Sequence, residues 1–358
     1  MMVSITRAAE SQRKPIPPDD TQLGFGRYFS DHMFMMDYAP EPGWHDARIV
    51  PYAPLPLDPA CMVLHYGQEA FEGLKAYRGV DGAIRLFRHG KNLERLNASA
   101  KRLCMPTFDV ATVADAMKQL VLLEKDWIPR TEGCALYIRP NLVGVDPFLG
   151  VRSSQTFLLY IIVGPVGSYY PEGFNPVSIW VSDRYVRAVR GGIGEAKTSG
   201  NYAASLYGQM EAKKKGYTQV LWLDGIEHRY VEEVGTMNIF FVIGDEAITS
   251  PLTGSILPGV TRDSVLQILR AWGHKVSERM LGIDEVVAAA EKGTLREVFG
   301  TGTAAIISPV GSFNYQDKTH RVADGRTGPL SNKLYEHILA IQYGKEPDPY
   351  GWVERIDL

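Results

Sequence analysis

The stretch GGIGEAKTSGNY, residues 191–202, sets a single lysine in a backbone of small residues. Glycines permit tight turns and let a backbone approach a bound group closely. One interpretation is the phosphate loop G-x-x-x-x-G-K-[ST], which requires glycine where Ala196 stands. That loop also leads into a helix, in which Gly200 would be out of place, and no acidic partner strand for magnesium is evident. We therefore reject the phosphate loop.

A second interpretation holds Lys197 on a tight backbone, where its amine forms a Schiff base with a carbonyl cofactor. Taken alone, the segment fits a solvated lysine in a flexible loop better. Downstream, YVEEVGTMNIFF at 230–241 changes this balance, because it places a carboxylate at a strand end before a glycine turn. Pyridoxal chemistry needs such an acid, since a buried carboxylate keeps the ring nitrogen protonated. By itself this segment is equally compatible with a hairpin that exposes its glutamate.

Two further segments suit a phosphate group. ILPGVTRD at 256–263 is a glycine turn that runs into a helix capped by Thr261, and the amides and dipole of a helix start bind anions. FGTGTAA at 299–305 is a second turn of small residues with hydroxyls. The ordinary alternatives are a helix cap without a ligand for the first segment and a β-bulge or tight corner for the second.

Composition bounds the class of protein. The 358 residues exceed the roughly 250–300 at which single cores stop growing, so we expect two domains. The 45% hydrophobic and 22% charged residues are ordinary for a globular protein. A formal net charge of −3 gives no reason to expect nucleic acid or an anionic membrane as partner. No apolar run reaches the about 18 residues that a membrane span needs.

Three cysteines, Cys61, Cys104 and Cys134, lie far apart without a Cys-x-x-Cys pair, which indicates free thiols in a reducing compartment. Residues 1–20 lack the apolar core of a secretory signal, and their acidic side chains argue against a mitochondrial presequence. We interpret them as a frayed polar tail and expect a cytoplasmic protein. The scattered histidines form no metal site and G-x-S-x-G is absent, so metal and serine-hydrolase chemistry have no support.

Short β-like runs alternate with amphipathic stretches. We predict strands at Cys61–Tyr66, Ile84–Phe87, Ala135–Arg139, Thr156–Val163, Val177–Ser182, Gln219–Leu223 and Asn238–Val242. Helices are predicted at Lys91–Leu103, Val110–Glu124, Tyr202–Lys215, Arg262–Trp272, Ile283–Lys292 and Leu330–Gly344. Uneven strand spacing argues against a doubly wound sheet, so we predict an α+β fold of two lobes, each with mixed sheet and packed helices.

Glycines and prolines in residues 164–173 mark a connection between the lobes. The predicted domains are a smaller N-terminal domain at 1–166, an interdomain loop at 167–177, and a larger C-terminal domain at 178–358 that carries the cofactor lysine.

Taken in order, the lysine loop, EVGTMN at 233–238, ILPGVTR at 256–262 and FGTGTA at 299–304 resemble the branched-chain amino acid aminotransferases of the fold-type-IV pyridoxal-phosphate enzymes. Upstream segments are similar to the same family: FG at 25–26, DHM at 31–33, HYG at 65–67, FEGLKAY at 71–77, LFR at 86–88, NLERL at 92–96 and YIRP at 137–140. The resemblance covers about residues 24–345. Each motif is weak alone, but the ordered set is highly specific.

The resemblance implies roles for individual residues. Lys197 would hold pyridoxal 5'-phosphate as a Schiff base and move the proton between the substrate Cα and the cofactor carbon. Tyr202 would hydrogen-bond the ring hydroxyl. Glu233, which directly precedes Val-Gly-Thr, would pair with the ring nitrogen, and a shift of one residue would favour Glu232. The remaining implied cofactor residues are Arg95, whose planar fork suits phosphate, and Thr236, Val260, Thr261 and Thr303.

The implied substrate-binding residues are Phe25, Tyr66, Phe71, Tyr137, Arg139, Tyr169, Thr236, Thr303 and Ala304. Tyr66 would enter from the partner subunit of an obligatory homodimer, and the amides around Thr303 and Ala304 would meet the substrate α-carboxylate. Ordinary core packing is the alternative for the aromatic residues. A Cys-x-x-Cys that some members carry falls on Ala305 and Ser308 here, which excludes a thiol switch at that place.

The activity that the resemblance implies is reversible transamination of leucine, isoleucine and valine with 2-oxoglutarate, so the partners are amino acids and 2-oxo acids. A D-amino-acid transaminase or an aminodeoxychorismate lyase of the same fold type is an alternative, which the EVGTMN and YIRP segments disfavour. A third hypothesis is a pseudoenzyme or binding module that kept the fold. Intact Lys197, Tyr202 and Glu233 disfavour it.

Overall fold

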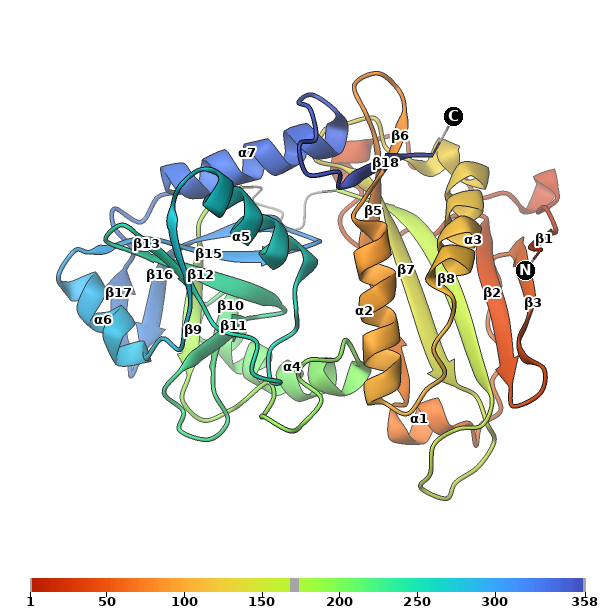
Figure 1. Ribbon diagram of the computed structural model, residues 1–358, viewed down its shortest axis with the longest axis horizontal. Coiled ribbons are helices and arrows are strands. Elements are labelled where there is room, and N and C mark those ends of the chain that lie inside the picture. Colours follow the sequence, from red (N-terminus) through yellow and green to blue (C-terminus); the bar gives the residue numbers. More distant parts are fainter. Residues whose placement is uncertain (1, 168–173, 357–358) are drawn as a thin grey trace. The chain divides into compact units, whose positions relative to one another are not determined.

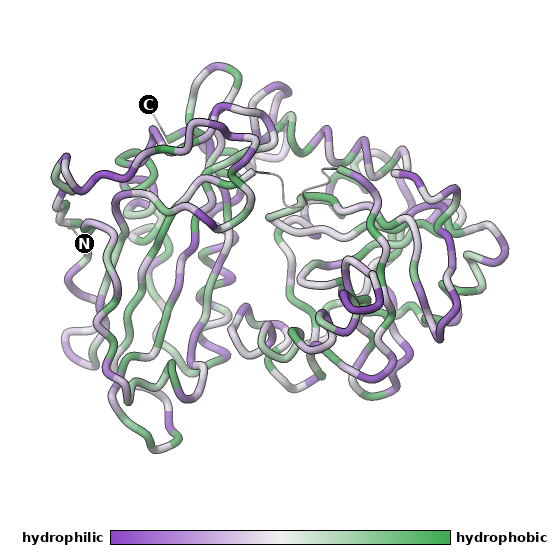
Figure 2. The backbone as a smooth tube through the Cα atoms, turned by 180° about the vertical axis from the view of Figure 1, so that it is seen from behind, coloured by the Kyte–Doolittle hydropathy of each residue, from purple (hydrophilic) through white to green (hydrophobic). Residues whose placement is uncertain are grey.

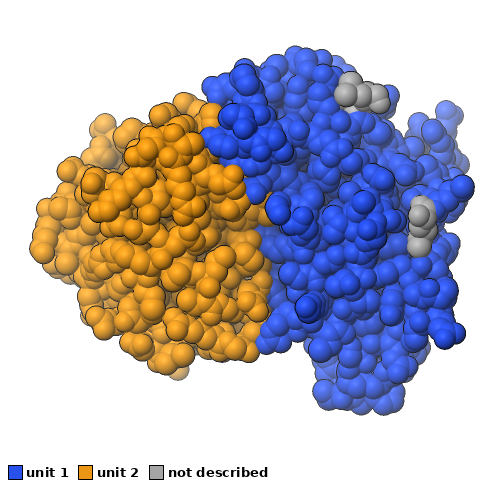
Figure 3. All heavy atoms as spheres, viewed as in Figure 1, with its two compact units in different colours: residues 1–171, 196–199, 339–358 blue, residues 172–195, 200–338 orange. Residues whose placement is uncertain are grey.

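The computed structural model describes residues 2–167 and 174–356 (Figure 1). The chain divides into two compact units, shown in different colours in Figure 3. Unit 1 comprises Met1–Pro171, Ala196–Ser199 and Leu339–Leu358, and unit 2 comprises Glu172–Glu195 and Gly200–Ile338. The predicted domains are continuous in sequence, whereas these units are not. Most of the predicted loop at 167–177 lies outside the described residues, and the domain boundaries stay a prediction.

Unit 1 is built on a nine-stranded sheet in the order β1-β3-β2-β8-β7-β5-β6-β18, with β4 paired to β7. All neighbouring strands are antiparallel except the parallel pair β1 and β3. The strands are β1 (Ser4–Ile5), β2 (His32–Ala39), β3 (Gly43–Pro51), β4 (Glu69–Phe71), β5 (Leu74–Arg78), β6 (Ile84–Phe87), β7 (Ala135–Gly144), β8 (Phe157–Val166) and β18 (Val353–Arg355).

Helices α2 (His89–Arg102) and α3 (Val110–Leu123) pack together over one face of this sheet (Figure 1). Apolar residues recur at helical spacing on both helices and meet alternate residues of the strands, such as Leu136 and Ile138 of β7. Figure 2 shows these apolar stretches as green segments along the strands and helices. Each fully buried leucine or valine stabilises the fold by about 1.5–3 kcal/mol. The opposite face of the sheet is thereby left for other side chains.

Unit 2 contains a small closed barrel. Its strands run in the order β11-β10-β9-β16-β15-β12, and an additional pairing of β11 with β12 closes the ring. The strands of this unit are β9 (Val177–Ser182), β10 (Gln219–Leu223), β11 (Val231–Val234), β12 (Met237–Ile243), β13 (Glu246–Thr249), β14 (Lys275–Glu278), β15 (Leu295–Gly302), β16 (Ile306–Tyr315) and β17 (Lys318–Arg321). Ile239 and Phe241 of β12 belong to its apolar core.

The remaining helices are α1 (Met62–Tyr66), α4 (Ser199–Lys214), α5 (Val260–Ala271), α6 (Ile283–Glu291) and α7 (Pro329–Tyr343), with short 3-10 helices η1 (Glu10–Gln12), η2 (Asp20–Gln22) and η3 (Lys125–Trp127). The predicted α+β class with two mixed sheets is therefore confirmed. Strands β6, β9 and β10 begin and end at the predicted residues, and each predicted helix occurs within three residues of its predicted ends.

The predicted strand at Cys61–Tyr66 is wrong. Met62–Tyr66 forms the short helix α1, which ends at Gly67 with φ +59 in the left-handed conformation. The Gly67 amide donates to the Val63 carbonyl at 3.1 Å, as at many helix ends. An apolar run this short does not distinguish strand from helix by its periodicity.

The predicted frayed tail at the N-terminus is also wrong. β1 pairs with β3 through Ser4 and Ile5, and Ala8 is buried. The Ala8 amide donates to Nε2 of buried His32 at 2.8 Å, and Nδ1 of that ring meets Glu124. The partners of this tail lie far along the chain, so no local pattern announced them. Across residues 2–167 and 174–356, no helix has the length and apolar character needed to span a membrane.

Candidate active site

Lys197, in unit 1, is anchored through its backbone. Its amide donates to Oγ of Ser99 in α2 at 2.8 Å, and its carbonyl accepts from the Phe71 amide of β4 at 3.0 Å. The next residue, Thr198, forms a β-bridge with Ala70. Nζ of Lys197 lies 4.8 Å from the centre of the Phe71 ring. The glycine-rich approach therefore ends in a fixed backbone position, from which a half-buried amine extends.

Arg95, also in unit 1, forms a two-pronged ion pair with Glu72, which is fully buried. Nε of Arg95 lies 2.6 Å from Oε1, and Nη2 lies 2.9 Å from Oε2. Asn92 and the Gly73 amide donate to the same carboxylate. Burial acts to raise the pKa of Glu72, but the charge and hydrogen bonds of Arg95, with the charge of Lys197, lower that pKa overall. The orientation of the guanidinium is thereby fixed.

Glu72→Ala should destabilise the protein by about 3–5 kcal/mol, because it leaves the Arg95 charge largely desolvated without its partner. The free energy of unfolding in urea measures the loss. Glu94→Ala in the same helix is the matched control, since the pair of Glu94 with Lys91 is exposed at 55% and 58% of the two side chains. We expect it to cost at most about 0.5 kcal/mol. Equal losses from the two variants would contradict the assignment.

The sheet face opposite α2 and α3 brings together an arginine and three aromatic rings. The guanidinium of Arg139 lies 4.9 Å from the ring centre of Phe71 and 5.3 Å from that of Tyr137. Nη2 of Arg139 also donates to the Tyr137 hydroxyl at 3.1 Å. Phe25 meets Tyr137 edge to face at 4.9 Å. Four predicted substrate residues of unit 1 therefore form one cluster, next to the ring over which Lys197 extends.

Tyr66 and Tyr169 do not join this cluster in the described structure. Tyr66 ends α1 with 43% of its surface exposed, and its hydroxyl hydrogen-bonds the Leu149 carbonyl. Tyr169 lies outside the described residues.

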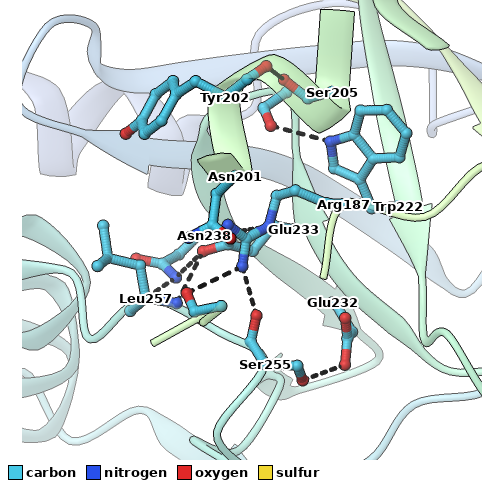
Figure 4. A network of polar contacts seen from close by, with 12 residues as sticks. Arg187, Asn201, Tyr202, Ser205, Trp222, Glu232, Glu233, Asn238, Ser255 and Leu257 are labelled. Atoms are coloured by element: carbon cyan, nitrogen blue, oxygen red, sulfur yellow. Dashed lines mark hydrogen bonds and ion pairs between the residues drawn. The ribbon is translucent and has the colours of Figure 1, made fainter. Parts of the chain in front are cut away.

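In unit 2, Glu233 is the centre of a buried polar network (Figure 4). Its Oε2 lies 2.5 Å from Nε of Arg187. Its Oε1 accepts from Nδ2 of Asn238 at 2.9 Å and from the Leu257 amide at 3.3 Å. Arg187 also donates to the carbonyls of Gly194 and Ser255. The carboxylate of Glu233 is held in its charged form by a cation and two further donors.

Glu232 and Glu233 lie on opposite faces of β11. Pairing of Val234 with Met237 puts Glu232 and Val234 on the face of the barrel core, whereas Glu233 pairs with Asn238 on the other face. Glu232 accepts from Oγ of Ser255 at 2.5 Å, and burial raises its pKa, an effect that Ser255 and Arg187 oppose. Only Glu233 contacts the backbone at Leu257 that leads into α5. These contacts favour Glu233 as the acid of the site.

The start of α5 carries the predicted phosphate residues Val260 and Thr261. The helix is capped by Gly259, without a side-chain cap, and Thr261 lies inside the first turn, so the predicted cap at Thr261 is wrong. A Cβ at Gly259 would lie 2.0 Å from Oδ1 of Asn238, which explains why glycine takes the capping position. The amides of this turn therefore begin beside the Glu233 network.

Thr236 and Thr303 lie in hairpin turns. Thr236 follows Gly235 between β11 and β12, and Thr303 and Ala304 lie between β15 and β16. Asn238 pairs with Thr301 of β15, so the Thr301 hydroxyl shares the face of Glu233. That hydroxyl is buried and has no hydrogen-bond partner among the described residues. Tyr202 lies in the first turn of α4, where its carbonyl accepts from Ser205 at 2.7 Å.

Sequence reasoning assigned no role to Arg187, Asn238 or Glu72. Glu72 and Asn238 stand inside quoted motifs, so their motifs were the available signal. Arg187 stands among Arg184 and Arg190 at equal spacing, and no local pattern tells a buried arginine from exposed ones. Across the described parts of the chain, no group of three or more His, Cys, Asp or Glu side chains could hold a metal ion.

Comparison with known proteins extends this description. The family model described as amino-transferase class IV matches residues 69–313. Branched-chain-amino-acid aminotransferase 2 of Bacillus subtilis (strain 168) is 56% identical over 346 residues, which are 97% of this chain and 95% of that protein. Branched-chain-amino-acid transaminase 1 of the same organism is 56% identical over 340 residues, covering 95% and 96%.

Two solved structures show the same fold. The branched-chain amino acid aminotransferase of Escherichia coli matches with a TM-score of 0.77 at 28% identity, covering 91% of this chain and 99% of that one. A second branched-chain amino acid aminotransferase, complexed with N-(5'-phosphopyridoxyl)-L-glutamate and described as the T.th. enzyme, matches with a TM-score of 0.76 at 27% identity, covering 94% and 99%. The chain therefore belongs to the class IV aminotransferases, and within that class to the branched-chain amino acid aminotransferases. The predicted family and fold type are confirmed.

Proposed function

We propose that the protein catalyses reversible transamination of leucine, isoleucine and valine with 2-oxoglutarate, using pyridoxal 5'-phosphate. The observation that carries this proposal is the 56% identity over 346 residues to a branched-chain-amino-acid aminotransferase. The same fold in a structure complexed with N-(5'-phosphopyridoxyl)-L-glutamate supports both the cofactor and glutamate as the common partner.

The residues present fit this cofactor. Glu233 offers a charged carboxylate for a ring nitrogen, and the Thr301 hydroxyl beside it is buried without a partner among the described residues. We propose that Lys197 binds the cofactor aldehyde and Tyr202 the ring hydroxyl. Phosphate would be bound by Arg95 and by the backbone and hydroxyls at Val260, Thr261 and Thr303, with Thr236 nearby. A helix start and a fixed guanidinium are both suited to a dianion.

The protein's own residues would then handle the proton and the substrate. Bound pyridoxal phosphate supplies an electron sink for the negative charge that develops at the substrate Cα. Nζ of Lys197 would take the proton from Cα and return it to the cofactor carbon. Glu233, held charged by Arg187, would keep a proton on the ring nitrogen. The amides around Thr303 and Ala304 would bind the α-carboxylate, while Phe25, Phe71 and Tyr137 would line the side-chain pocket together with Tyr66 and Tyr169.

Steady-state kinetics with a panel of amino donors test this function. We expect the three branched-chain amino acids and glutamate to be used, and D-alanine not to be. The purified protein should be yellow, because a cofactor bound to lysine absorbs in the visible. A colourless protein that binds no pyridoxal phosphate would overturn the proposal.

Arg139→Leu should separate the two kinds of donor. The pocket must accept an isobutyl group in one half-reaction and the glutamate carboxylate in the other, and a buried carboxylate needs a partner. A charged hydrogen bond contributes about 1.5–3 kcal/mol, so kcat/KM for glutamate should fall roughly 10- to 100-fold. Leucine should change much less. Equal losses for both donors would mean that Arg139 only braces the strand before Pro140.

We further propose a homodimer. Unit 1 exposes a group of apolar residues around Tyr66, whose hydroxyl contacts Leu149: Leu64 at 61%, Phe148 at 43%, Leu149 at 60% and Val151 at 86% exposure. Such a patch is typical of a protein interface, and the sequence resemblance brings Tyr66 to the partner's site. Analytical ultracentrifugation should show a dimer, and Leu149→Asp should weaken it. The free thiols of Cys61, Cys104 and Cys134 support a reducing, cytoplasmic location.

A further inference from the structure

Glu69 shares a sheet face with the proposed specificity residue Arg139. In the antiparallel pairing of β4 with β7, Glu69 lies opposite Val143 and Phe71 opposite Asn141. Side chains alternate along a strand, so Glu69 and Phe71 point to the same face as Tyr137, Arg139 and Asn141. Tyr160 of β8 also lies opposite Asn141 and joins this face. The face therefore carries one carboxylate close to the arginine.

The surroundings of Glu69 keep its carboxylate near Arg139. Glu69 is half-buried and hydrogen-bonds Ser199, whose hydroxyl donates to the Gly67 carbonyl at 3.2 Å. Burial raises the pKa of Glu69, while the Ser199 hydrogen bond and the charge of Arg139 oppose this shift. The pKa of Tyr160 is raised to about 12 by burial and by the charge of Glu69, with Arg139 acting in the opposite sense. Glu69, Arg139 and Tyr160 thus form one electrostatically linked group.

A half-buried arginine in an aromatic pocket needs an anion in every state of the enzyme. Glutamate brings a side-chain carboxylate to Arg139, but leucine brings none. Without a second anion, the leucine complex would leave the guanidinium desolvated beside an isobutyl group, which is costly. The carboxylate of Glu69 is placed to serve in that state.

We propose that Glu69 is the counter-ion that Arg139 uses when the substrate side chain is apolar, and that it competes with the glutamate carboxylate for this arginine. Glu69 is thus a specificity-determining residue that favours branched-chain over acidic donors. The proposal rests on the proposed transaminase function. Specificity is a difference between two affinities, so removing the competitor affects the two donors with opposite sign.

Glu69→Gln tests this, because glutamine keeps the size and the Ser199 hydrogen bond but loses the charge. We expect KM for glutamate to fall and KM for leucine to rise, so that the ratio of kcat/KM values shifts toward glutamate by roughly 10-fold. Glutarate and 4-methylpentanoate, which do not react, should show the same opposite shifts in their inhibition constants. Glu69→Asp retains the charge and should restore most of the leucine preference.

Exposed Glu94→Gln in α2 is the control and should leave both donors unchanged. Equal losses for leucine and glutamate in Glu69→Gln would overturn the proposal, because they are what a merely structural role at Ser199 predicts. If Glu69→Gln fails to fold, the same ratio measured in Glu69→Asp and in Tyr160→Phe decides, and an unchanged ratio in both contradicts the proposal. Failure of the wild-type protein to use either donor would instead refute the proposed function itself.

Discussion

Lys197→Ala is expected to lower kcat for the leucine reaction by at least roughly 10²–10⁴-fold, the range that general acid–base catalysis contributes. The variant loses both the covalent anchor of the cofactor and the base at Cα. Because the Lys197 backbone, not its side chain, bonds Ser99 and Phe71, the substitution should leave the fold intact. Stopped-flow measurement of the first half-reaction, with near-UV circular dichroism as a check of folding, gives the result.

Borohydride reduction of the wild-type protein, followed by peptide mapping, identifies the lysine independently. The pyridoxyl label should be on Lys197. Lys213, Lys214 and Lys215 are exposed around the far end of α4 and serve as internal controls. A label on any of these three lysines would refute the assignment, and a Lys197→Ala enzyme with near wild-type turnover would do the same.

Glu233→Gln should reduce the rate of Cα deprotonation by roughly 10²–10³-fold, as the loss of one preorganised electrostatic partner does in other enzymes. Glutamine keeps the shape but no longer holds a proton on the ring nitrogen. Cofactor affinity should weaken only modestly, because the lysine and the phosphate contacts remain. The rate should be measured at saturating cofactor, since the variant also leaves Arg187 without its counter-ion and is therefore less stable.

Glu232→Gln is the matched control for Glu233→Gln. Glu232 faces the barrel core and bonds Ser255, so its loss should affect stability more than the rate of deprotonation. The reverse pattern, with a slow Glu232→Gln and a near-normal Glu233→Gln, would show that the acid is one residue earlier than proposed.

Periodicity in the sequence was sufficient to locate the long elements. Helix α3 and strands β6, β9 and β10 have strong apolar patterns and begin at the predicted residues. Helix α1 was missed because its five residues carry too few apolar positions to define a period. The docking of Ala8 on His32 depends on a contact across 24 residues, which no window of local sequence contains.

The candidate site shows the same limit. Lys197 and Glu233 stand in motifs that chemistry explains, and could be proposed from the sequence. The cation that holds Glu233, Arg187, lies 46 positions earlier in the chain, and the counter-ion of Arg95 lies 23 positions away in another element. Such partners are set by strand register and helix packing, so they become visible only in three dimensions.

Closure of the barrel in unit 2 has a consequence for the motion of its acid. β11, only four residues long, is hydrogen-bonded to β10 on one side and to β12 on the other, so Glu233 stands on a strand without a free edge. A strand bonded on both sides opens only when much of the barrel opens with it, and its amide protons exchange with solvent correspondingly slowly. The carboxylate is thus presented by one of the least mobile parts of the backbone. Its position relative to the rest of unit 2 stays constant through repeated turnover.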